Sequence, residues 1–258
     1  MKTIFRIIRF FLIFFCGLFL YSCQKEMVWQ AEAGIAKVNV INAVVTGGNA
    51  KVNVSAKQIN WSSIPDNQAL GGFTLSRMFI VPTDRNTVFQ LVPLSDTTNM
   101  WYNQVAQLDG GKVYTLYLSG TPTDLKTKFQ EEINFPDYVI RDPGKPTPSA
   151  DSIVNIRFVN LSSSGPKLDI NMLNNIALEA NDLGYQQFTD FKAYPARNNT
   201  YTITFQIRNS ADKSLIATYD FNADFFRFKS VAVVLMGVYN TLGLPFVDNY
   251  RIESIPYQ

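Results

Sequence analysis

An internal repeat constrains the fold of this chain more than any other feature of its sequence. Five matches occur in the same order along the 258 residues, and their offsets drift only between 113 and 118 positions. A tandem duplication followed by insertions in loops would leave this pattern, so we expect Asn42 to superimpose on Asn160 and Gly120 on Gly237. The matches pair Val38–Ala43 with Ile156–Leu161, Lys51–Val54 with Lys167–Ile170, Phe73-Thr74 with Phe188-Thr189, Val81-Pro82 with Tyr194-Pro195, and Gly120 with Gly237.

Both copies consist of short segments rich in β-branched and aromatic residues, which favour strands. In the clearest segment polar and apolar residues alternate, which predicts that Tyr201, Ile203, Phe205 and Ile207 share one buried face. The predicted strands are Lys37–Asn42, Lys51–Ser55, Thr87–Val92, Val113–Leu118, Asn155–Asn160, Lys167–Asn171, Thr200–Arg208 and Val231–Leu235.

Strands joined by short turns, without long helical patterns between them, favour antiparallel sheets packed face to face. We therefore predict an all-β fold of two tandem antiparallel immunoglobulin-like β-sandwich domains. The first covers residues 35–125, and the second covers residues 152–258 with a C-terminal extension. Residues 126–151 are expected to hold a short helix, around Leu125–Ile133, and a Pro-rich linker. Such a linker predicts two domains that unfold independently.

The composition excludes several kinds of chemistry. The chain has no His, which excludes Ser-His-Asp and Cys-His catalytic arrangements and His-ligated metal sites. Its aromatic fraction of 14% is too high for a disordered chain. We expect a folded protein without a cofactor.

Residues 1–22 predict a bacterial lipoprotein signal peptide. Three basic residues, Lys2, Arg6 and Arg9, precede an uncharged run over residues 10–21, which is too short to span a bilayer. The following Leu20-Tyr21-Ser22-Cys23 resembles the lipobox, although Tyr21 is bulkier than the usual residue. In lipoproteins the peptidase cuts before the Cys, whose thiol carries a diacylglycerol. We predict cleavage between Ser22 and Cys23 and lipidation of Cys23 with palmitate-type chains. The alternative is an ordinary signal peptide or membrane anchor with a chance Cys.

Removal of the signal peptide changes the net charge and the number of free Cys residues. The mature chain keeps 20 basic and 21 acidic residues, a net charge of −1, so its charge gives no argument for nucleic-acid binding. Cys16 leaves with the signal and Cys23 carries lipid, so neither a disulfide nor a catalytic thiol remains. We predict an outer membrane lipoprotein, on the periplasmic face or the cell surface, with a tether over residues 23–34.

Several strand and turn motifs resemble a known family. Val38–Asn42, Ile156–Ser162, Tyr194–Ala196 and Tyr114–Gly120 are similar to motifs in tandem copies of domain-of-unknown-function family 4397, which is frequent in lipoproteins of Bacteroidetes. The resemblance covers roughly residues 35–240. It implies a β fold and an envelope location, and it carries no catalytic residue.

Two groups of oxygen-bearing side chains were considered for chemistry. A group of Asn residues and an Asp after a predicted strand offers ligands for calcium, but its spacing matches no EF-hand and is typical of turns. A group of acids around the linker is expected to be solvent-exposed and not to form the facing pair of a glycosidase. We predict no metal site and no catalytic residue. The two groups are Asn171, Asn174, Asn175, Asn181 and Asp182, and Glu131, Glu132, Asp137, Asp142 and Asp151.

Trp101 and Tyr102 are the candidate ligand-stacking residues, because neighbouring aromatic rings can stack on pyranose rings. Successive strand residues face opposite sides of a sheet, so at most one of the two is expected in the core.

These observations predict a membrane-anchored envelope lipoprotein that acts as a non-catalytic binding or structural module for a glycan or an envelope protein. The alternative is a surface glycan-binding or His-free polysaccharide hydrolase component of a glycan-uptake system. Two buried acids roughly 5–10 Å apart in a cleft would favour the hydrolase. A spacer without any ligand also remains open.

Overall fold

The computed structural model describes residues 34–46, 48–72, 74–133, 153–196, 201–239 and 248–257. The predicted signal peptide, Ser22, Cys23, nearly all of the predicted tether and most of the predicted linker lie outside the described residues. Residues 31–258 form a compact unit by themselves. No α-helix of membrane-spanning length and hydropathy occurs among the described residues.

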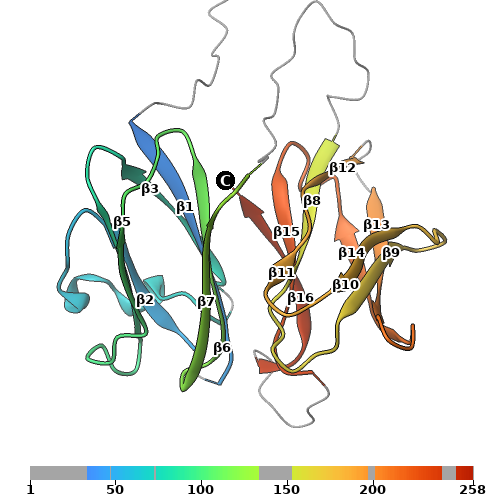
Figure 1. Ribbon diagram of the computed structural model, residues 1–258, viewed down its shortest axis with the longest axis horizontal. Coiled ribbons are helices and arrows are strands. Elements are labelled where there is room, and N and C mark those ends of the chain that lie inside the picture. Colours follow the sequence, from blue (N-terminus) through green and yellow to red (C-terminus); the bar gives the residue numbers. More distant parts are fainter. Residues whose placement is uncertain are drawn as a thin grey trace, which may run out of the picture. The chain divides into compact units, whose positions relative to one another are not determined.

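The described residues form an all-β fold, as predicted (Figure 1). Residues 34–133, here called the first half, contain seven strands and two short 3-10 turns. These elements are β1 (Ile35–Val44), β2 (Ala50–Ser55), η1 (Trp61–Ser63), η2 (Asp66–Gln68), β3 (Ser76–Pro82), β4 (Thr87–Pro93), β5 (Tyr102–Ala106), β6 (Val113–Thr121) and β7 (Asp124–Glu131).

Residues 153–257, the second half, contain nine described strands. They are β8 (Ile153–Asn160), β9 (Leu168–Met172), β10 (Leu178–Leu183), β11 (Gln187–Phe188), β12 (Lys192–Pro195), β13 (Thr202–Asn209), β14 (Leu215–Asn222), β15 (Ser230–Met236) and β16 (Arg251–Tyr257).

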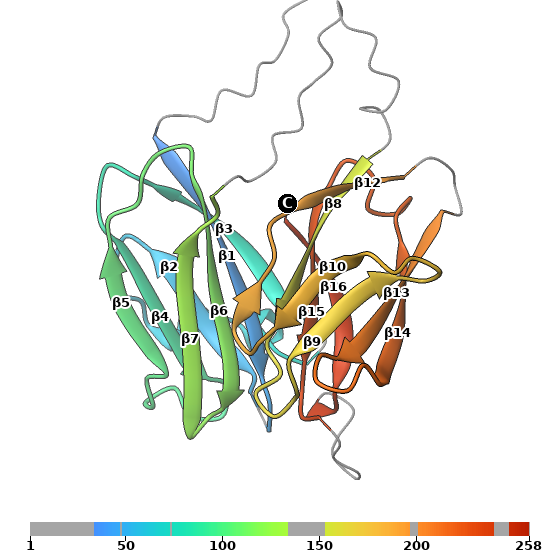
Figure 2. The same cartoon turned by 45° about the vertical axis from the view of Figure 1, so that its right-hand side comes forward.

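Each half has two sheets (Figures 1 and 2). The first half has the strand orders β3-β1-β6-β7 and β2-β4-β5. The second half has the orders β11-β8-β15-β16, with β12 also paired to β8, and β10-β9-β13-β14. The β1–β6 and β8–β15 pairs are parallel, so the prediction of purely antiparallel sheets is wrong. Parallel neighbours need a long crossover, and four strands intervene along the chain between β1 and β6.

The predicted helix around Leu125–Ile133 is also wrong, because these residues form β7 and its end. Strand β7 pairs with β6 along its whole length, from Asp124 opposite Thr121 to Glu131 opposite Tyr114. The Lys, Gln and Glu residues of this segment favour a helix only weakly, and pairing with the edge of a sheet overrides that preference.

Three apolar core clusters hold the sheets together. One lies between the two sheets of the first half and includes Phe89 and Leu116. Another lies between the two sheets of the second half and includes Phe158 and Phe205. The third joins the sheets β3-β1-β6-β7 and β11-β8-β15-β16, so the halves share part of their core. It includes Ile41, Tyr117, Val159, Val234 and Tyr257.

Strand β13 shows the predicted alternation. Ile203, Phe205 and Ile207 are buried and Thr204 is partly exposed. Tyr201 precedes the strand and is exposed, so the prediction that it shares the buried face is wrong. The alternation therefore holds within β13 and does not extend to the residue that precedes it.

The two halves repeat the same buried hydrogen bonds. The side-chain oxygens of Asn42 and Asn160 each accept from the backbone N–H two residues ahead, over 3.1 Å in both cases. Their Nδ2 atoms donate to Leu70 O over 2.9 Å and to Leu183 O over 3.1 Å. Both Asn side chains therefore tie the end of a central strand to a following loop or edge strand in the same way.

A second hydrogen bond that occurs in both halves shows that one of the sequence matches is displaced by two residues. Asn53 Nδ2 donates to Gln90 Oε1, and Asn171 Nδ2 donates to Gln206 Oε1, over 3.1 Å in each half. Asn53 thus corresponds to Asn171, whereas the sequence match placed it against Asp169. A shift of two residues keeps the side chains on the same face, which is why the apolar pattern did not reveal it.

Candidate functional site

The structure places the predicted ligand-stacking residues at the core of the first half. Tyr102 is buried, and its hydroxyl donates to Gln104 Oε1 over 2.7 Å. Trp101 precedes β5 and is half-buried against the same core. Both aromatic residues therefore contact one core, and the prediction of a stacking surface is wrong for Tyr102, whose ring is not accessible.

The Asn-rich segment after β9 forms turns and edge contacts. Asn174 and Asp182 adopt positive φ angles of 62° and 54°, which short polar side chains tolerate. Asn171 Nδ2 donates to three oxygens, including Asn175 O, and Asp182 pairs with Lys167 over 2.7 Å. No cluster of three or more acidic or Cys side chains suited to a metal ion is found among the described residues.

Only one of the two acids at the end of β7 has the predicted solvent exposure. Glu131 pairs with Lys112 and is partly exposed, but the Glu132 side chain is fully buried, so the expectation of a solvated acid is wrong for Glu132. Asp137, Asp142 and Asp151 lie outside the described residues. Burial of Glu132 follows from its position at the junction of the two halves, which no local pattern indicates.

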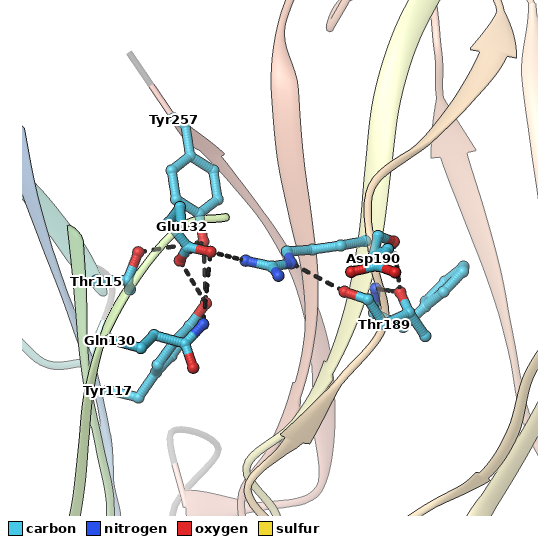
Figure 3. Close-up of polar contacts among 9 residues, drawn as sticks. Thr115, Tyr117, Gln130, Glu132, Thr189, Asp190 and Tyr257 are labelled. Atoms are coloured by element: carbon cyan, nitrogen blue, oxygen red, sulfur yellow. Dashed lines mark hydrogen bonds and ion pairs between the residues drawn. The ribbon is translucent and has the colours of Figure 1, made fainter. Parts of the chain in front are cut away.

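Glu132 is the centre of a buried polar cluster at this junction (Figure 3). Its Oε2 pairs with Arg157 Nη1, from β8 of the second half. Its Oε1 accepts from the hydroxyls of Tyr117, over 3.3 Å, and Tyr257, over 3.2 Å. These two hydroxyls lie 3.0 Å apart, and Thr115 Oγ1 lies 3.4 Å from that of Tyr257.

Aromatic rings complete the surroundings of Arg157. Its guanidinium carbon lies 4.8 Å from the ring centre of Phe188 and 4.4 Å from that of Phe191, in cation–π geometry. Its Nε donates to Thr189 O over 3.2 Å. The cation is thus held by rings and a carbonyl of its own half and by a carboxylate of the other half.

The surroundings shift the pKa of several groups in the cluster. Burial raises the pKa of the Tyr117 hydroxyl well above its ordinary value, with contributions from Tyr257 and Glu132. Burial also raises the pKa of Tyr257. For Arg157 burial opposes the charge, but the neighbouring Tyr117, Tyr257 and Glu132 groups outweigh it and raise the pKa. At neutral pH Tyr117 and Tyr257 are therefore neutral and Arg157 is charged.

This cluster has the chemistry of a structural clamp. Neither Glu132 nor Arg157 has a side chain more than 3% exposed, so a substrate cannot reach the carboxylate. A general acid or base must come within hydrogen-bond reach of the group on which it acts. The cluster therefore joins the two halves.

A cavity of about 400 Å³ lies at the other side of the same junction. Much of its lining is backbone and small residues, including Gly48, Gly71 and Gly237. A Cβ at Gly71 would lie 2.3 Å from Asn49 Oδ1, so the chain segments approach closely here. Its volume falls within the range typical of small-ligand sites.

Two ionisable side chains from the second half line this cavity. Arg251 Nη2 donates to Gly72 O over 2.9 Å, while its buried Nε has no hydrogen-bond partner among the described residues and lies 3.7 Å from Glu253 Oε1. Asp248 is buried, and its Oδ1 accepts from the Thr46 N–H over 2.6 Å. A guanidinium that lines a cavity can bind a polar or anionic ligand.

The described residues that line the cavity include one carboxylate, that of Asp248. Glycoside hydrolysis by carboxylates needs a facing pair. Neither Asp248 nor Arg251 was a candidate in the sequence, because they lie in the C-terminal extension without a motif. Searches against protein-family models and curated proteins found no match to the chain.

Proposed function

We propose that this protein is a membrane-anchored envelope lipoprotein whose folded part is a non-catalytic binding module built of two tandem immunoglobulin-like β-sandwiches. Its relation to domain-of-unknown-function family 4397 is part of the same proposal. The cavity with Arg251 and Asp248 carries the binding role, because a guanidinium and a carboxylate line a space of a size that suits a small ligand.

The repeated geometry supports the tandem arrangement. Asn42 and Asn160 make equivalent bonds, and Gly120 and Gly237 have φ angles of 88° and 90° at the ends of β6 and β15. In both halves a Pro at the end of an edge strand also pairs with the first residue of the central strand. Independent evolution of the two halves would not produce these coincidences.

The binding role is tested with a soluble body of residues 24–258. The compact unit of residues 31–258 contains all three core clusters, so this body is expected to fold. The body is screened on a glycan array and used to capture fragments of the envelope. A ligand that the unaltered body retains should be lost on Arg251→Met and kept on Arg85→Met, an exposed Arg outside the cavity.

The outcomes separate the three readings of the function. Equal retention by both variants would place binding elsewhere, and no retention by a folded body would leave a structural spacer. Release of sugars from any retained polysaccharide would favour the hydrolase component of a glycan-uptake system.

The anchor is tested separately with labelled palmitate. Cys23→Ala should leave the precursor uncleaved at this position and free of lipid. Palmitate incorporation by this variant would mean that the lipobox assignment is wrong.

A further inference from the structure

The strands of both halves define one common end of the molecule, here called the anchor end. The parallel pairs place Lys37 beside Val113 and Asn155 beside Ser230, so β1, β6, β8 and β15 all begin there. The contact between Glu132, after β7, and Tyr257, in β16, brings these ends of the two halves together. The cavity lies at the opposite end, near the end of β1.

Exposed apolar side chains gather at the anchor end. Phe225 and Phe228 lie in the turn before β15, where the Phe228 N–H donates to Ile153 O at the start of β8. Tyr201 lies beside them, since its carbonyl accepts from the Ala223 N–H. The Phe225 side chain is 68% exposed.

A second exposed apolar group lies in the turn between β9 and β10. The Leu173 N–H donates to Thr204 O, near the beginning of β13, which places this turn at the anchor end of its sheet. Leu173 and Leu178 are exposed, and the Ile176 side chain is 100% exposed.

Most of the remaining exposed apolar residues also lie at the anchor end. Ile133 directly follows β7, Ile80 pairs with Lys37, and Val105 pairs with the second residue of β4, all towards the anchor end. Of the eleven large apolar side chains that are exposed among the described residues, only Met100 and Leu215 lie towards the opposite end. Single exposed apolar residues need no explanation, but their concentration at one end does.

Some of the charged groups at this end are paired. Asp224 pairs with Arg227 and Glu131 pairs with Lys112, whereas Asp109 and Asp220 are exposed acids without an ion pair among the described residues. Lys229 Nζ lies 5.5 Å from the ring centre of Phe225. Phe rings beside a Lys can sit at the headgroup level of a bilayer.

The predicted lipid anchor would join the molecule at this same end. Cys23 lies twelve positions before Ile35, the first residue of β1. Even fully extended, that length of chain spans only about 40 Å, at ~3.3–3.6 Å per residue. The start of β1, at the anchor end, is therefore held within about 40 Å of the bilayer that carries the acyl chains.

We propose that the anchor end is a membrane-contact surface, occupied by the bilayer that carries the lipid on Cys23. Its contacts are Phe225, Phe228 and Tyr201 together with the turn that contains Ile176. This orientation presents the cavity away from the membrane. The inference rests on the lipoprotein assignment in the proposed function.

The test uses the mature lipidated protein in vesicles of phosphatidylethanolamine and phosphatidylglycerol that contain lipids with doxyl spin labels. In this form the Cys23 thiol is blocked, so a fluorescent maleimide reacts only with an introduced Cys. The labelled variants are Phe225→Cys and Ile176→Cys at the anchor end. Leu215→Cys is the control, since Leu215 is 51% exposed at the opposite end.

We expect doxyl lipids to quench the dye and a blue shift of its emission at positions 225 and 176, and neither effect at position 215. Because the Ile176 side chain contacts solvent only, its replacement cannot disturb the core. Equal quenching at all three positions, or none, would overturn the proposed orientation. Quenching that depends on protein density and not on doxyl lipid would assign the surface to a second copy of the chain, which also overturns it.

Mass spectrometry of the same samples tests the lipidation of Cys23 separately from the membrane contact. An unmodified Cys23 would overturn the lipoprotein assignment and this inference with it. Lipid on Cys23 without selective quenching would overturn the membrane-contact surface alone.

Discussion

Glu132 and Arg157 form an ion pair between the two halves of the molecule, and both side chains are almost completely buried. The first half has a different residue at the position that corresponds to Arg157. By the pairing of β1 with β6 and β8 with β15, the position of Arg157 corresponds to Asn39, whose Nδ2 is buried without a hydrogen-bond partner among the described residues. The ion pair thus joins the two halves and has no counterpart at Asn39.

Loss of one partner of this pair should destabilise the protein strongly. Arg157→Met leaves the Glu132 carboxylate buried and unpaired, and we expect a loss of about 3–5 kcal/mol in the free energy of unfolding. Glu132→Gln combined with Arg157→Met should lose much less, because no uncompensated charge remains. Urea unfolding of both variants measures the difference, and a single variant no less stable than the double variant would contradict the clamp.

Truncation of Phe205 should test the core of the second half. Its ring lies 5.0 Å from that of Phe158 in an edge-to-face arrangement, and the residue is fully buried. We expect Phe205→Ala to lower the free energy of unfolding by about 3–5 kcal/mol. Thr204→Ala removes only an exposed hydrogen bond to Asp220 and should cost under about 1 kcal/mol.

The same variant tests how the halves unfold. The sequence predicted independent unfolding, but the third core cluster contains residues of both halves. We therefore expect calorimetry of Phe205→Ala to show that both halves melt at a lower temperature. An unchanged transition for the first half would mean that the shared cluster does not couple them.

Gly120 and Gly237 should respond alike to substitution. Both have positive φ angles, and an added Cβ would lie 2.4 Å from Asp124 O at Gly120 and 2.1 Å from Asn249 O at Gly237. We expect Gly120→Ala and Gly237→Ala each to cost about 1–3 kcal/mol in thermal or urea unfolding, from backbone strain and the close contact. Gly34→Ala is the control, because nothing lies within 4 Å of its added Cβ. A loss at only one of the two glycines would argue against equivalent turns.

Alkaline pH should weaken the junction through Tyr117. Burial raises its pKa above the ordinary value of 10.0, so the folded state favours the neutral hydroxyl. This contribution is complete below the unfolded-state pKa of about 10 and decreases as the pH rises towards the folded-state pKa. The free energy of unfolding, measured between neutral pH and about pH 11, should fall above pH 10 and fall less steeply in Tyr117→Phe. Identical slopes would show that Tyr117 does not contribute to the pH dependence.

The sequence identified the interior strands of the sheets well. The eight predicted segments correspond to β1, β2, β4, β6, β8, β9, β13 and β15. All of these except β2 have a neighbour on each side. Interior strands are apolar at alternate positions, as in β13, or nearly throughout, as in β15, and both patterns are recognisable without tertiary information.

The strands that the sequence missed all lie at sheet edges. They are β3, β5, β7, β10, β11, β12, β14 and β16. An edge strand is paired on one side only and is partly solvated, so its composition is mixed and its pattern irregular. Strand β7 illustrates this, since five of its eight residues are half-buried and the others exposed.

The candidate sites depend on contacts that the sequence does not signal. Thr46 and Asp248 meet at the cavity although they are 202 residues apart, and Tyr117 meets Tyr257 across 140 residues. The sequence around Glu132 does not distinguish it from an exposed acid. It is buried because β8 brings Arg157 against it.

The all-β class, most interior strands, the repeated Asn and Gly positions and the absence of His chemistry could be predicted from the amino-acid sequence, because each leaves a local or regularly spaced pattern. The parallel strand pairs, the shared third core, the Glu132–Arg157 clamp and the cavity with Arg251 could be seen only in the folded chain. The same holds for the concentration of exposed apolar side chains at one end. These features arise where segments that are distant in the sequence come into contact. Such contacts depend on how whole sheets pack, and sheet packing leaves no periodic pattern in the sequence.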